Sequence, residues 1–121
     1  MVNVGKLIDM TKGSELEGLA TMSMPWKEAC IKLFTAAGDP ARLEIGILLS
    51  SRGRMNVGDI ASHFKLSRPA ISHHLKVLKD AKVVRSEKVG QEVFCWLDTG
   101  YVATMLRSVA DMLEECQETG P

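Results

Sequence analysis

The sequence predicts a mostly α-helical fold with a small β-hairpin wing, namely a dimeric winged helix-turn-helix of about five helices. Three observations predict it. Two capped helices follow one another across a tight turn at Leu66-Ser67. Two β-rich runs, 83–89 and 92–97, are joined by a two-residue loop. A final apolar stripe at residues 102–116 is long for the terminal helix of a small monomer, so we expect a second copy to cover it.

The first two helices are predicted from proline and capping positions. Residues 1–23 are weakly patterned and are interpreted as an N-terminal arm or a short extra helix, ahead of the winged helix-turn-helix and dimerisation domain at 24–119. Pro25 is expected to open the first clear helix at its first-turn position. Asp39-Pro40 is a cap and first-turn pair for a second helix, whose core face is expected to consist of Leu43, Ile47 and Leu48.

The next elements form the helix-turn-helix and the wing. Met55 is predicted to pair as a very short strand, and Asn56 to cap a third helix. Ser67 is expected to cap a fourth helix that runs to about residue 81. The loop Gly90-Gln91, with glycine first, predicts a type II′ hairpin turn. The last helix is expected from about Tyr101 to residue 117.

The fourth helix has two different faces. On a helical wheel Ile71, Leu75 and Leu78 fall within about 60° and are expected to face the core. The opposite face carries hydroxyl, imidazole and cationic groups, which suit the base edges and phosphates of a DNA major groove. The predicted partner is therefore double-stranded operator DNA, and the predicted contacts on this helix and the wing are Ser67, Arg68, Pro69, Ala70, Ser72, His73, His74, Lys76, Arg85, Lys88 and Gln91.

Charge is distributed unevenly although the formal net charge of the 121-residue chain is zero. Residues 62–88 hold seven basic and two acidic residues, whereas residues 89–121 hold one basic and six acidic residues. A basic segment beside an acidic one favours docking on a polyanion in one orientation.

Several classes of protein are not expected. No apolar run approaches the roughly 20 residues of a membrane span, and the N-terminus lacks an apolar signal region, so we expect a cytoplasmic protein. We find no nucleophile elbow, no phosphate-binding glycine loop and no carboxylate pair in a plausible cleft, so we expect neither an enzyme nor a cofactor. Three dispersed cysteines argue against a disulfide framework and a zinc knuckle.

Two strings resemble a known family. Leu33-Phe34-Thr35-Ala36-Ala37-Gly38-Asp39-Pro40-Ala41-Arg42-Leu43 resembles the opening of the ArsR family of repressors. The string from Leu66 to Leu78, above all Ser72-His73-His74-Leu75-Lys76, resembles its recognition helix. The resemblance implies a homodimer built on the first and last helices. It also implies operator binding that an unknown small-molecule or redox inducer relieves.

The departures from the family concern metal. Asn56 and Gly58 stand where the family's thiolate motif has its two cysteines, and no histidine follows His74 for the family's last-helix site. We therefore expect no metal site. Cys30 and Cys116 lie on the two helices implied at the dimer interface, so a thiol-based redox or soft-metal sensor is one alternative. A winged-helix protein-interaction module without DNA binding is another.

Overall fold

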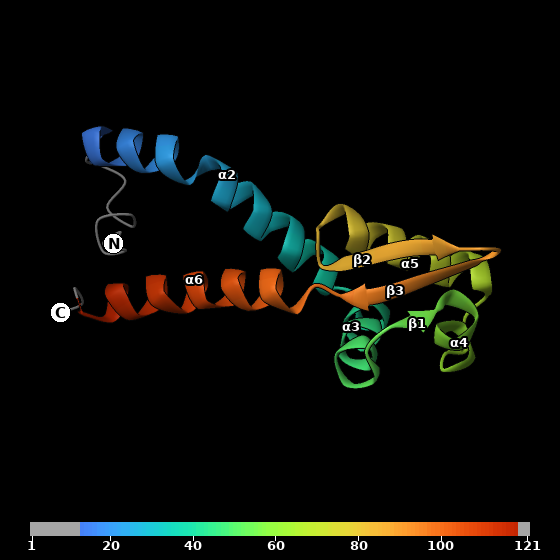
Figure 1. Ribbon diagram of the computed structural model, residues 1–121. Coiled ribbons are helices and arrows are strands. Elements are labelled where there is room, and N and C mark those ends of the chain that lie inside the picture. The colour runs from blue at the N-terminus through green and yellow to red at the C-terminus, as the bar shows by residue number, and fades with distance from the viewer. Residues whose placement is uncertain (1–12, 119–121) are drawn as a thin grey trace. The chain divides into compact units, whose positions relative to one another are not determined.

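The computed structural model describes the backbone of residues 13–118 and the side chains of residues 25–115. These residues form five helices and three strands, as Figure 1 shows. The chain divides into two compact units, one of residues 31–102 and the other of residues 1–30 and 103–121. In chain order the elements are α2 (Gly13–Ala37), α3 (Pro40–Arg52), β1 (Met55–Asn56), α4 (Val57–Ser62), α5 (Arg68–Asp80), β2 (Val84–Val89), β3 (Glu92–Leu97) and α6 (Thr99–Glu118). The helix-turn-helix is α4 with α5, and the wing is β2 with β3.

Helix α2 begins earlier than the sequence indicates. The helix is already formed at Gly13, so Pro25 lies inside it and the prediction that Pro25 opens the helix is wrong. Proline has a backbone φ that fits a helix, and it removes only one main-chain donor while its ring presses on the carbonyl one turn earlier. The helix continues through that local loss. Residues 13–23 of the predicted arm thus belong to α2, and residues 1–12 lie outside the described part of the chain.

The three predicted N-caps are confirmed. The side chain of Asp39 accepts a hydrogen bond from the backbone N–H of Arg42 at 3.1 Å. Asn56 accepts from Asp59 at 2.7 Å, and Ser67 accepts from Ala70 at 3.2 Å. Each bond satisfies an amide at the start of a helix that has no partner within the helix. Helix α6 starts two residues before the expected Tyr101, because Asp98 accepts from the Tyr101 N–H at 3.1 Å and acts as a fourth cap.

The predicted core face of α3 is wrong. Leu43 and Ile47 are 51% and 59% exposed, whereas Ile45 and Leu49 are 0% and 1% exposed. Apolar residues at three- and four-residue steps occur on two sides of this helix, so periodicity alone does not choose between them. Packing decides, because α3 contacts β3 and α5 through its other side.

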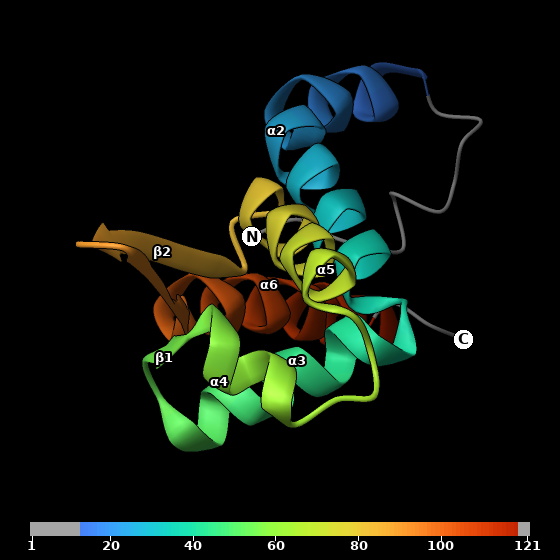
Figure 2. The same ribbon diagram turned by 90° about the vertical axis from the view of Figure 1, so that its right-hand side faces the viewer.

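The core of the 31–102 unit lies beneath α5. The predicted stripe is confirmed, since Ile71, Leu75 and Leu78 are all buried. They pack with buried side chains of α3, α4 and the sheet, notably Ile45, Ile60, Val84 and Cys95. Helix α5 contacts α3, α4 and β2, and Figure 2 shows it above α4 with strand β2 of the wing to its left.

The sheet is antiparallel with strand order β1-β3-β2. The predicted short strand at Met55 is confirmed, and it pairs with Cys95 on β3. The wing closes with Val89 opposite Glu92. In the turn Gly90 has a φ of 62° and Gln91 has no positive φ, which agrees with the predicted type II′ turn. Two backbone bonds fix the wing to its neighbours: the Val83 N–H donates to the Leu78 carbonyl at 3.0 Å, and the Asp98 N–H donates to the Val83 carbonyl at 2.8 Å.

The cap of α5 gives a stability prediction. Substituting Ser67→Ala leaves the Ala70 amide without its side-chain acceptor and should lower the free energy of unfolding by about 1 kcal/mol. Ser67→Asn keeps an acceptor at the same position and should retain most of the stability. Urea unfolding followed by circular dichroism measures both. Equal loss in the two variants would contradict a capping role for Ser67.

Candidate nucleic-acid interface

The exposed side of α5 is a continuous polar surface. Ser72, His73 and Lys76 are exposed and lie opposite the buried stripe, and Ala70 is half-buried at its margin. Arg68 and Pro69 are exposed in the first turn. A hydroxyl, an imidazole and an ammonium group are thus presented side by side on a helix whose other side is fixed in the core. Such a surface can donate and accept hydrogen bonds at base edges and pair with phosphates.

His74 lies differently from the other residues predicted to contact DNA. It is half-buried, and its Nδ1 lies 3.3 Å from Nη1 of Arg42 on α3. A guanidinium only donates, so Nδ1 is the acceptor when this contact is a hydrogen bond. The His73 ring is tilted by 53° from the His74 ring with centroids 6.1 Å apart, so the two rings do not share one orientation. His74 therefore holds α5 to α3 instead of facing outward with His73.

Arg42 connects three elements. Its Nε donates to the Ala36 carbonyl at the end of α2 at 2.7 Å, and its other arm reaches His74 on α5. The Arg42 N–H bond to the Asp39 carboxylate, with the nearby Arg42 and His74 charges, holds the pKa of that carboxyl below its usual value. Arg42 lies within the ArsR-like string, but its role was not predicted from the sequence. No local pattern pairs residues 32 positions apart.

Ser67 and Arg68 both have neighbours within the helix-turn-helix. Ser67 Oγ accepts the capping hydrogen bond from the Ala70 N–H, so its primary role is to stabilise the start of α5. The Arg68 guanidinium extends over α4, since a Cβ built on Gly58 would lie 3.9 Å from its Nη1. Arg68 is exposed and stays within reach of a ligand at this corner of the helix-turn-helix.

The basic residues of the wing lie on opposite faces of the sheet. Arg85 is paired with Trp96 and Lys88 with Val93, and side chains alternate between faces along a strand. Val93 and Cys95 lie on the same side as α5 residues, so Lys88 shares the α5 side and Arg85 lies on the other. Gln91 is exposed in the turn. The wing therefore offers Lys88 and its tip, and not Arg85, to a ligand lying along α5.

The other wing face is covered by Arg54. Its guanidinium lies 5.0 Å from the ring centroids of both Phe94 and Trp96, and it forms an ion pair with Glu87 at 3.0 Å. Asn56 adds a hydrogen bond from Nδ2 to Glu92 at 3.2 Å. These contacts fix the wing to the segment before the helix-turn-helix. Arg54 was not predicted as a functional residue, because an isolated arginine before a short strand carries no sequence pattern.

The two cysteines whose side chains the structure describes are poorly placed for thiol chemistry. Cys30 and Cys95 are free and buried, and burial raises the pKa of both thiols, although Lys79 acts in the opposite direction on Cys95. A raised pKa disfavours the reactive thiolate. The Cys116 side chain lies outside the described residues. Among the side chains that are described, no group of three His, Cys, Asp or Glu residues could hold a metal ion.

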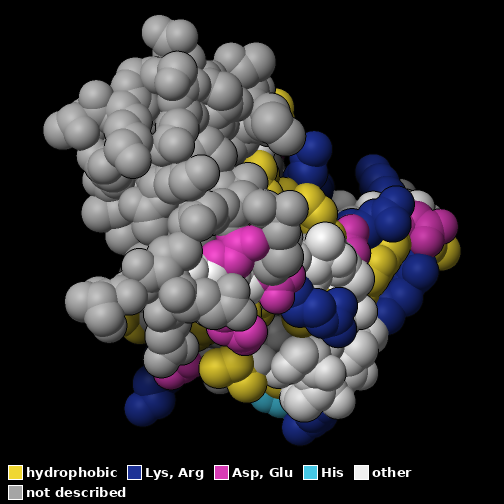
Figure 3. Space-filling model, turned by 90° about the vertical axis from the view of Figure 1, so that its left-hand side faces the viewer, with side chains coloured by type: hydrophobic (Ala, Val, Ile, Leu, Met, Phe, Trp, Pro, Cys, Tyr) yellow, Lys and Arg dark blue, Asp and Glu magenta, His cyan; other side chains and the backbone are white. Residues whose placement is uncertain are grey.

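Charge on the described surface is mixed. On the face drawn in Figure 3, Lys and Arg side chains (dark blue) gather toward the right, with a few Asp and Glu side chains (magenta) among them. Helix termini and basic side chains therefore supply local positive charge in a chain whose net charge is zero. Within residues 13–118, no helix is both long and apolar enough to cross a membrane.

Comparison with known proteins agrees with this geometry. The profile of the bacterial regulatory protein, arsR family matches residues 39–86, which contain α3, α4, α5 and the start of the wing. The transcriptional repressor SdpR of Bacillus subtilis (strain 168) is 46% identical over 67 residues, which cover 55% of this chain and 73% of the repressor.

Solved structures share the architecture. An ArsR-like transcriptional regulator from Rhodococcus sp. RHA1 superposes with a TM-score of 0.69 at 26% identity, covering 76% of this chain and 86% of that one. The homodimeric winged helix-turn-helix DNA-binding domain of a possible ArsR-family regulator from Mycobacterium bovis superposes with a TM-score of 0.60 at 22% identity, covering 74% and 84%. The predicted winged helix-turn-helix fold is confirmed.

The contact between Arg42 and His74 can be tested by a double-mutant cycle. Arg42→Met removes the donors to Ala36 and His74 but keeps the aliphatic stem, and should lower the free energy of unfolding by about 1–2 kcal/mol. Exposed Arg107→Met should change it by less than about 0.5 kcal/mol. In the His74→Ala background, Arg42→Met should lower the free energy of unfolding by about 0.5–1 kcal/mol less than it does in the parent chain. Strict additivity in urea unfolding would show that the two side chains do not interact.

Proposed function

The chain belongs to the ArsR family of bacterial regulatory proteins, and on that premise we propose that it represses transcription by binding double-stranded operator DNA as a homodimer. The observation that carries the proposal is the exposed surface of α5, where Ser72, His73 and Lys76 stand opposite a fully buried stripe. A repressor of this kind acts where the chromosome is, in the cytoplasm. Its relative SdpR is named a transcriptional repressor.

Each exposed group has a proposed task in the complex. Ser72 and His73 hydrogen-bond to base edges in the major groove, and Pro69 and Ala70 contact thymine methyl groups. Lys76 and Arg68 pair with phosphates, as does the start of α5. The wing contributes Lys88 and Gln91. Lys88 lies on the face of the sheet that is turned toward α5, and Gln91 lies at the tip of the wing. His74 supports the surface from behind through Arg42.

Exposed apolar side chains support a dimer. Ile31 and Phe34 on α2 and Leu106 and Leu113 on α6 are large apolar residues left in contact with solvent. Monomeric proteins rarely leave such residues uncovered on several helices. The structurally similar domain from Mycobacterium bovis is described as homodimeric. We infer that a second copy covers these helices and places two α5 helices on two half-sites, about 34–36 Å apart or a multiple of that.

The alternatives have less support. A thiol sensor needs an accessible thiolate, and Cys30 is buried with a raised pKa. A protein-interaction module gives no reason for the hydroxyl, imidazole and ammonium groups on the outer side of α5. No observation favours an enzyme.

Base reading on α5 predicts a loss of specificity. Ser72→Ala and His73→Ala should each reduce the preference for the operator over unrelated DNA by roughly 1–3 kcal/mol, because a base contact is lost. The measurement is fluorescence anisotropy with a selected operator and a scrambled duplex. Unchanged preference in both variants would show that this side of α5 does not read bases.

The phosphate contacts have a matched pair of wing variants. Lys88→Ala should weaken binding to all sequences and reduce the slope of affinity against salt by about one ion, because one phosphate contact is lost. Arg85→Ala removes the same charge from the opposite face of the wing and should do less. Equal effects of the two variants on the salt slope would contradict the face assigned to the wing contact.

The homodimer is tested by sedimentation. Without DNA at micromolar concentration the chain should sediment as a dimer, because the apolar side chains of α2 and α6 are otherwise left in water. Phe34→Glu and Leu113→Glu should shift it toward monomer, whereas Lys65→Glu on the α4–α5 turn should not. A monomeric parent chain would refute the dimer.

A further inference from the structure

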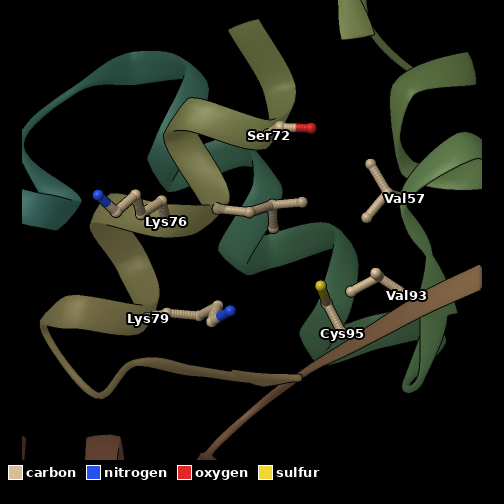
Figure 4. A pocket seen from close by; sticks show the side chains of 7 residues that line it. Val57, Ser72, Lys76, Lys79, Val93 and Cys95 are labelled. Carbon is tan, nitrogen blue, oxygen red and sulfur yellow. The ribbon is translucent and has the colours of Figure 1, made fainter. Parts of the chain in front are cut away.

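A hollow lies beside α5 on the side of the wing. It has a volume of about 210 Å³ and is lined by residues of α4, α5 and β3, all within the 31–102 unit: Val57, Ser72, Leu75, Lys76, Lys79, Val93 and Cys95. Figure 4 shows these side chains around the space between α5 and β3. The volume corresponds to about seven water molecules at roughly 30 Å³ each, which is room for a compound of about six to ten non-hydrogen atoms.

The walls of the hollow are apolar with one inward cation. Val57, Leu75 and Val93 supply aliphatic surface, and the buried Cys95 thiol forms part of the base. Burial raises the pKa of Cys95, so the thiol is neutral and does not repel an anion. In Figure 4 the Lys79 side chain points toward Cys95, while the Lys76 ammonium points away. The structure gives Lys79 no ion-pair partner among the described side chains, and no carboxylate lines the hollow.

We propose that this hollow binds a small carboxylate with a short apolar tail, and that the bound compound competes with DNA. The carboxylate pairs with Lys79, a charge-assisted contact, and the tail lies against Val57, Leu75 and Val93. An apolar pocket with a single convergent cation matches this class of ligand better than a sugar or a nucleotide, which need several polar partners.

Competition follows from shared residues and rests on the proposed function. Ser72 and Lys76 line the hollow and also belong to the proposed DNA surface of α5. A compound in the hollow lies against both side chains and brings a negative charge next to the place of a DNA phosphate. Ligand and DNA therefore exclude one another, which gives the repressor a means of release that needs no metal and no thiol chemistry.

The site is tested first without DNA. Hexanoate, with eight non-hydrogen atoms, is titrated into the ¹³C-methyl-labelled full-length chain at millimolar concentration, and the methyl resonances of Val57, Leu75 and Val93 should shift together. Hexylamine has the same tail and the opposite charge and should leave them unchanged.

Lys79→Gln should weaken hexanoate binding about tenfold, because a charged hydrogen-bond partner is lost. Lys82→Gln removes an equal charge outside the hollow and should bind as the parent does. Absent shifts, or equal binding by Lys79→Gln, would overturn the site.

The competition is tested second. Hexanoate should raise the apparent Kd for operator DNA in the parent and in Lys82→Gln, but far less in Lys79→Gln, and hexylamine should not raise it. Methyl shifts without any change in DNA affinity would overturn the competition. A chain that binds no DNA at all would refute the proposed function, whereas the methyl titration would still decide whether the hollow binds a carboxylate.

Discussion

The structure of this protein depends on the burial of one side of α5. Ile71, Leu75 and Leu78 are each almost fully removed from water, and burying such a side chain is worth roughly 1.5–3 kcal/mol. Any one polar contact on the outer side contributes about 1 kcal/mol or less to stability. The apolar stripe therefore sets the rotation of the helix about its axis, and the residues presented to DNA are those that the rotation leaves outside. The Arg42–His74 contact secures the middle of α5, and the Val83–Leu78 backbone bond secures its C-terminal end.

The elements that could be predicted from sequence are those that short-range chemistry determines. The caps at Asp39, Asn56 and Ser67 each act on an amide three residues away, so the relevant partners are visible in a few consecutive letters. The wing turn is similarly local, because glycine alone accepts the required φ at low cost. The buried side of α5 was predictable because its apolar residues occupy one stripe only.

The features that could not be predicted depend on partners distant in the chain. Two apolar sides of α3 were equally plausible, and only the packing on β3 and α5 selects Ile45 and Leu49. His74 was assigned to the DNA surface, but its partner is Arg42, 32 positions earlier. The separation of Arg85 from Lys88 followed from strand alternation, yet which face meets α5 emerged only from the fold. The family resemblance supplied the architecture of the candidate site and not these contacts.

Asn56 takes part in a strand pairing, a helix cap and a hydrogen bond to the wing, and this limits which residues can replace it. Its backbone pairs with Phe94, its Oδ1 caps α4, and its Nδ2 donates to Glu92 on the wing. By the resemblance to the ArsR family, this position matches one cysteine of the family's thiolate motif. A cysteine at this position would remove both side-chain bonds, and a single sulfur binds a soft ion poorly because ligation needs at least two that converge. Gly58 would have to change as well. A single exchange at Asn56 toward the thiolate pattern therefore removes two hydrogen bonds that hold α4 and the wing and supplies no second sulfur to the ion.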